Sequence, residues 1–79
     1  MMLGMIVEKT GQMKVSYKKL RIMLVERDMT KTDLKEKIGV SSTTMAALNA
    51  DRNVSLAVLL KICEFFQCDI GDIMEVVKN

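Results

Sequence analysis

The sequence predicts an all-α fold of five short helices that follow a short N-terminal arm. Three observations support this prediction. From Tyr17 onward, apolar residues recur at helical spacing. Serine, threonine and aspartate stand where helices would begin. Gly39 separates two short helical segments and suits a tight turn between them. With 79 residues, the chain has room for one domain.

Residues 1–16 form the predicted arm, and residues 17–79 form the helical domain. Within the arm, the β-prone runs GMIVEK and MKVSY are separated by TGQ. This pattern fits a hairpin with Gly11 in its turn, a single strand with an arm, or a loose tail. The sequence does not choose among the three.

Four of the five predicted helices have a start signal of their own. The first begins near Tyr17, and its apolar face is Leu20, Met23 and Leu24. Thr30 and Asp33 make a capping-box pair at the start of the second helix. Its expected apolar stripe is Leu34 and Ile38.

Ser41 caps the third predicted helix, residues 41–49, in which Met45 and Leu48 face inward. Ser55 caps the fourth helix, whose expected core residues are Leu56, Leu59, Ile62, Cys63 and Phe66. A short fifth helix is predicted to begin near Asp69, where acidic groups suit the positive end of a helix dipole.

Two short helices joined at a glycine suggest a helix-turn-helix motif. The run MTKTDLKEKIGVSSTTMAALNADRNVSLAVLLKICEFFQCDIGDIM resembles the Cro/CI-type helix-turn-helix domain of XRE-like bacterial and phage regulators. The carriers of this resemblance are Thr30, Leu34, Gly39, Val40, Ser41, Met45 and Leu48, followed by SLAVLLKIC and QCDIGDI. The resemblance implies a lambda-repressor-like domain with helix 41–49 in the DNA major groove.

The resemblance also implies which side chains contact double-stranded DNA: Lys31, Thr32, Ser41, Ser42, Thr43, Ala46, Ala47, Asn49 and Arg52. The base-facing positions among these are Ser42, Thr43, Ala46 and Ala47. Hydroxyl groups can donate or accept there, and methyl groups can touch thymine. Lys31 and Arg52 are phosphate candidates, although both also fit ordinary solvated charges.

The chain departs from the family pattern in two places. Lys35 stands where the family usually has a small alanine between the two helices, so its stem is expected to bend outward. In addition, helix 41–49 has no Arg, Lys, Gln or Asn on its central face. Bidentate reading of guanine or adenine is therefore largely absent, which predicts modest sequence specificity.

A hydrophobic share of 49% exceeds what so small a core needs. Family members commonly bind twofold operators as dimers, so we expect a homodimer. The expected interface residues are Ile22, Val25, Val58, Leu60, Phe65, Val76 and Val77. The function predicted first is a sequence-preferring transcriptional regulator that acts as a repressor. The alternative is an antitoxin-like module whose main partner is another protein.

Charge and composition narrow the remaining classes. The net charge is +2, but residues 1–40 carry nine basic and five acidic side chains, a balance of +4. That distribution is compatible with a nucleic-acid-binding side. Without histidine, a phosphate loop or a nucleophile–base pair, we expect no enzyme, cofactor or metal. We expect Cys63 and Cys68 to be a reduced pair in a cytoplasmic protein with no membrane partner.

Overall fold

The computed structural model describes residues 13–78. It contains four α-helices, one 3₁₀ turn and a two-stranded antiparallel sheet. In chain order these are β1 (Met13–Ser16), α2 (Lys18–Glu26), α3 (Lys31–Ile38), α4 (Ser42–Asn49), α5 (Leu56–Phe66), η1 (Ile70–Asp72) and β2 (Glu75–Lys78).

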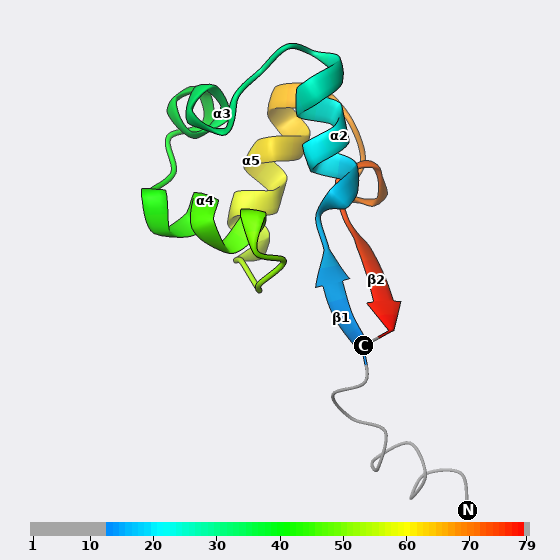
Figure 1. The fold of residues 1–79 in the computed structure, drawn as a ribbon. Helices are drawn as coiled ribbons and strands as arrows, with labels where there is room; N and C mark the ends of the chain where they lie inside the picture. Colours follow the sequence, from blue (N-terminus) through cyan, green and yellow to red (C-terminus); the bar gives the residue numbers. More distant parts are fainter. Residues whose placement is uncertain (1–12, 79) are drawn as a thin grey trace, which may run out of the picture.

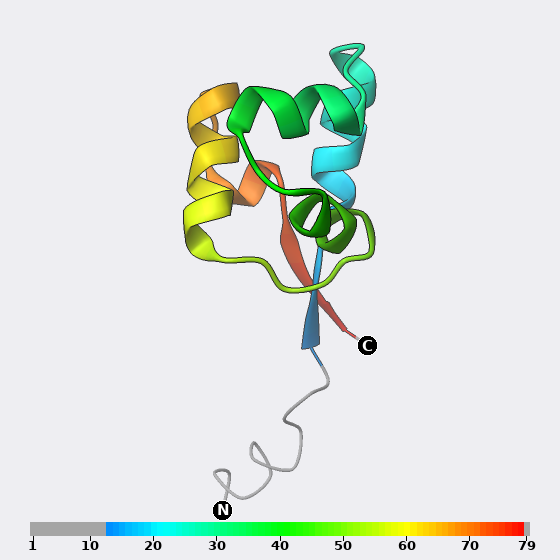
Figure 2. The same ribbon diagram turned by 90° about the vertical axis from the view of Figure 1, so that its left-hand side faces the viewer.

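The helices surround one apolar core, in which α3 contacts both α4 and α5, and the α3–α4 pair lies on one side of the helical body (Figure 1). A quarter turn of the view shows α3 crossing above α4, which is then seen nearly end-on (Figure 2). The buried core residues are Tyr17, Leu20, Leu24, Leu34, Met45, Leu48, Leu59, Ile62, Phe66 and Ile73. Burial of these side chains is the main favourable contribution to folding.

Three helix starts follow the predicted capping chemistry. The Thr30 hydroxyl accepts from the Asp33 N–H at 3.0 Å, and the Asp33 carboxylate accepts from the Thr30 N–H at 2.9 Å. Ser41 and Ser55 cap α4 and α5 by accepting from backbone N–H groups three residues on. These bonds satisfy donors that have no partner inside the helix.

The predicted fifth helix is wrong. Asp69 and Asp72 do form a capping box, but it starts only the three-residue 3₁₀ turn η1. The chain then extends into β2, which pairs with β1 in the register Met13↔Lys78 through Ser16↔Glu75. Valine favours a strand, and a partner strand from the other end of the sequence is available.

The β1–β2 ribbon projects from the helical body in both views (Figures 1 and 2). Residues 13–16 of the predicted arm are therefore the first strand of this ribbon. The predicted hairpin turn at Gly11 and its first strand lie outside the described residues.

The predicted core was right at most positions, but one residue was wrongly included and two were missed. Leu56 was expected inside, yet it is 61% exposed at the first position of α5. Tyr17 and Ile73 were not expected in the core, yet they are 1% and 0% exposed. Both lie where the helical body meets the ribbon, which the sequence pattern did not predict. Within residues 13–78 no helix is long and apolar enough to cross a membrane.

Candidate nucleic-acid interface

The turn between α3 and α4 fixes how the two helices cross. Gly39 ends α3 with φ +70 and ψ 44, and its N–H donates to the Lys35 carbonyl. This left-handed conformation is one that glycine adopts without a Cβ penalty. Two residues later Ser41 caps α4, so the chain turns from one helix into the other within a few residues.

Helix α4 has an inward and an outward side. Met45 and Leu48 are 8% and 2% exposed and pack into the core. Ser42, Thr43 and Ala46 are exposed. A surface of small side chains lets the backbone of a helix approach another molecule closely, so α4 presents the kind of face that the sequence predicted.

The remaining α4 candidates have more limited positions. Ala47 is half-buried, so only part of it faces outward. Asn49 is exposed and is the last residue of α4, while Ala50 occupies the C-cap. The Ser41 hydroxyl accepts from the Thr44 N–H at 3.1 Å and lies 3.1 Å from the Thr44 hydroxyl. Its first role is therefore to cap the helix.

Cationic side chains flank α4 on two sides. Lys31 and Thr32 are exposed in the first turn of α3. Arg52 is exposed in the loop after α4, where its N–H donates to the Ala47 carbonyl at 2.9 Å. The capping box already uses the Asp33 N–H, so the Lys31 ammonium is the stronger candidate for an anion at this end of α3.

Lys35 is a functional candidate that the sequence reasoning missed. Its ammonium donates to the Ser42 hydroxyl at 2.9 Å, across the turn from α3 to α4. Lys35 is half-buried, and its charge lies over the first residue of α4. The positive end of a helix dipole is there too, so a cation and the helix end together favour an anion at this position. The signal was the unusual lysine itself.

A redox or metal-binding site has little support in the described part of the chain. Cys63 and Cys68 are free and half-buried. Burial is the main effect that raises the pKa of the Cys68 thiol, and the nearby Cys63 and Asp72 raise it further. Residues 13–78 contain no cluster of three or more His, Cys, Asp or Glu side chains able to hold a metal ion.

Comparison with known proteins agrees with this geometry. The model of the Cro/C1-type HTH DNA-binding domain matches residues 19–79. The chain belongs to this family. It is 32% identical over 56 residues to YozG, an uncharacterized HTH-type transcriptional regulator of Bacillus subtilis (strain 168), a match that covers 68% of this chain and 67% of YozG.

A solved structure is also similar. The crystal structure of the transcriptional regulator VanUg superposes with a TM-score of 0.83 at 51% sequence identity, covering 86% of this chain and 91% of that one. The predicted resemblance to Cro/CI-type domains is therefore confirmed. The matched family and the similar chains are transcriptional regulators rather than enzymes.

Proposed function

We propose that this chain is a sequence-preferring DNA-binding repressor that places α4 in the major groove of double-stranded DNA. The observation that carries the proposal is the outward face of α4, with Ser42, Thr43 and Ala46 exposed on a helix that a tight glycine turn fixes against α3. A helix with such a face fits the width of the major groove. Occupancy of a promoter site by α4 then excludes other proteins from it.

Phosphate contacts supply most of the affinity in this proposal. Lys31, Lys35 and Arg52 flank α4 and carry the charges that a DNA backbone attracts. Thr32 and Asn49 add polar groups at the two margins of this surface. Base discrimination comes from hydroxyl and methyl contacts of Ser42, Thr43, Ala46 and the exposed part of Ala47, with DNA shape contributing the rest.

We also propose that the chain acts as a homodimer. Val25 is 76% exposed, Val76 58%, Leu60 57%, Ile22 47% and Phe65 39%. Large apolar side chains exposed on three elements of so small a domain favour burial against another molecule. Val58 and Val77 are half-buried, and Val58 already packs against the chain's own core. They can contribute only partly to such an interface.

Selection from a randomised duplex pool at low and moderate salt tests the DNA-binding proposal. We expect enrichment of a roughly palindromic site, with binding that weakens steeply as salt increases because phosphate contacts release counterions. Absence of binding even at low salt would overturn the proposal. The antitoxin-like alternative, with a protein as the main partner, would then be the one to pursue.

Sedimentation equilibrium of the full chain tests the homodimer. We expect a dimer that Val25→Glu or Leu60→Glu weakens, because a buried unpaired carboxylate is costly. Asn53→Glu, which adds the same charge to an exposed polar position outside the proposed interface, is the matched control. A monomer at all concentrations would contradict the proposed dimer without affecting DNA contact by one copy.

A further inference from the structure

The N-terminal end of α2 lies against the C-terminal end of α4, and neither helix end carries the charge that it prefers. Helix α2 has no side-chain cap and no acidic residue in its first turn. Helix α4 has no basic residue in its last turn. Acidic groups stabilise the first turn of a helix and basic groups the last, so both ends lack a local charge, although the Ser16 hydroxyl accepts from the Lys18 N–H at 3.3 Å.

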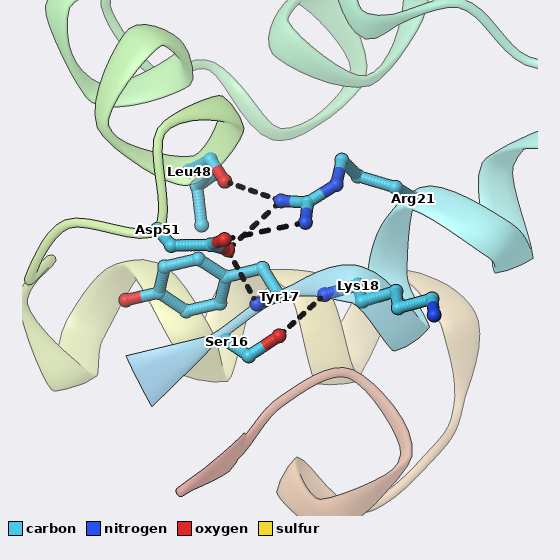
Figure 3. Close-up of polar contacts among 6 residues, drawn as sticks. All are labelled: Ser16, Tyr17, Lys18, Arg21, Leu48 and Asp51. Carbon is cyan, nitrogen blue, oxygen red and sulfur yellow. Dashed lines mark hydrogen bonds and ion pairs between the residues drawn. The ribbon is translucent and has the colours of Figure 1, made fainter. Parts of the chain in front are cut away.

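Each helix end receives that charge from the other side of the contact (Figure 3). The Asp51 carboxylate, just past α4, accepts from the Tyr17 N–H at 2.9 Å. The Arg21 guanidinium of α2 donates to the Leu48 carbonyl in the last turn of α4 at 3.2 Å.

The two side chains also bind each other. Arg21 Nη1 lies 2.9 Å from Asp51 Oδ1, and Nη2 lies 3.4 Å from Oδ2. This paired geometry restricts both position and angle more than a single contact does. Hydrogen bonds from Arg21 first, and then from the Tyr17 backbone, hold the pKa of the Asp51 carboxyl below its ordinary value.

Asp51 lies directly after the C-cap residue of α4, where the chain leaves the helix. Its φ is 58, in the left-handed region that favours glycine over other residues. The Arg52 N–H donates to the Ala47 carbonyl at 2.9 Å, so the left-handed residue ends α4. Three hydrogen bonds to the carboxylate, one from Tyr17 and two from Arg21, then hold the Asp51 side chain against α2.

We propose that Arg21 and Asp51 are positioning residues that set the orientation of α4 against α2, and through it the discrimination between cognate and other DNA. The inference rests on the proposed function, because α4 is the helix that would read the bases. Lys35 holds the first residue of α4 from the α3 side, and the Arg21–Asp51 pair holds its other end. Base contacts depend on both ends being fixed.

The effect of each substitution on DNA affinity distinguishes a positioning role from a purely electrostatic one. Removing the negative charge of Asp51 reduces repulsion of phosphates, so a mere surface charge predicts stronger binding to every duplex. Removing the positive charge of Arg21 predicts weaker binding to every duplex. A positioning pair instead predicts that both changes lower the ratio of cognate to noncognate affinity.

The test uses the full chain with Asp51→Asn, Asp51→Gly, Arg21→Met and Arg21→Lys. Asp51→Gly removes the carboxylate while suiting the left-handed backbone, so it is the variant least damaging to the turn. The duplexes are the site enriched by the wild-type chain and a scrambled duplex of equal length, at one salt concentration. For the first three variants we expect the affinity ratio to fall about fivefold or more, comparable to the loss of one base contact. The affinity ratio should fall less in Arg21→Lys.

Ile73→Val is the matched control. Ile73 is fully buried at the end of η1 and makes none of the hydrogen bonds of Arg21 or Asp51, so the variant loses stability while every group of the pair is kept. Its affinity ratio should equal that of the wild-type chain. An unchanged ratio in Asp51→Asn and Arg21→Met would overturn the inference, as would an equal fall in Ile73→Val.

Residual dipolar couplings of the free protein test the orientation without DNA. We expect the couplings of the α4 amides to change relative to those of α2 in Asp51→Asn and Arg21→Met, but not in Ile73→Val. Unchanged couplings would overturn the positioning role. If the wild-type chain bound no duplex, the proposed function would fail together with the discrimination, while the couplings would still decide whether the pair orients α4.

Discussion

Gly39→Ala isolates the conformational role of the turn between α3 and α4. Gly39 has φ +70, and a Cβ added there would meet no other atom within 4 Å. The substitution therefore adds no steric clash with its surroundings, and its cost is the left-handed backbone alone. That cost is about 1–2 kcal/mol for an L-residue. For a chain of this size it corresponds to a fall in Tm of roughly 5–15 °C.

Gly71→Ala is a matched control for this prediction. A Cβ at Gly71 also meets nothing within 4 Å, but Gly71 does not have a positive φ. Alanine there restricts the unfolded chain and should stabilise by about 0.4–1 kcal/mol. Thermal unfolding by circular dichroism measures both variants. Equal effects of the two substitutions, or no loss in Gly39→Ala, would refute the conformational argument.

Three further predictions concern the candidate interface. Lys35→Met should weaken binding to all duplexes and reduce the salt slope by about one, because one phosphate contact is lost, and it should also lower the ratio of cognate to noncognate affinity, because Lys35 holds the first residue of α4. The control is Lys19→Met. The Lys19 ammonium donates to the Gly71 carbonyl, so its removal should leave the salt slope unchanged in the same titration. Thr43→Ala should relax preference at one base pair per half-site by about fivefold, as scored by repeated selection, and a changed Tm would argue against a surface role. Hydrogen bonds with Arg21 and Tyr17 lower the pKa of Asp51 from 3.8. The ionised carboxylate therefore stabilises the folded chain fully above that value, and this stabilisation is lost as pH falls through the lower pKa of the folded state. The Tm difference between wild type and Asp51→Asn should therefore narrow below about pH 4, and a difference constant with pH would contradict this assignment.

The helix starts were predictable because capping is local. Thr30 needs only the residue three positions on to complete its capping box, and both partners are visible in the sequence. Ser41 and Ser55 likewise cap helices through backbone N–H groups of the next turn. Gly39 was identifiable for the same reason, because the left-handed turn depends on one residue.

The structure that follows Asp69 was not predictable from capping signals. Asp69 and Asp72 gave a true capping signal, but the signal does not state how many residues follow in the helix. The length was decided by a strand at the other end of the sequence, since β2 pairs with Met13–Ser16. Strand formation depends on such distant partners more than helix formation does.

The candidate site likewise has features that the sequence predicted and features that it did not. The outward face of α4 follows from helical periodicity, so the exposure of Ser42, Thr43 and Ala46 was predictable from the sequence, whereas Ala47 of the same predicted face is half-buried. The contacts of Lys35 and of the Arg21–Asp51 pair join different elements, and the pair spans 30 residues. Nothing in local spacing indicates which of several charged residues meet, so these contacts required the fold.

The composition of the α4 face makes these supporting contacts more important. A long guanidinium or amide side chain can adjust its torsions when a helix is slightly displaced, and still reach a base edge. Serine, threonine and alanine have little such reach. Their dispersion contacts weaken substantially with a gap of 0.5–1 Å. A recognition helix built from short side chains therefore discriminates among bases only if its backbone is held closely in place. The Lys35–Ser42 hydrogen bond at one end of α4 and the Arg21–Asp51 ion pair at the other meet that requirement.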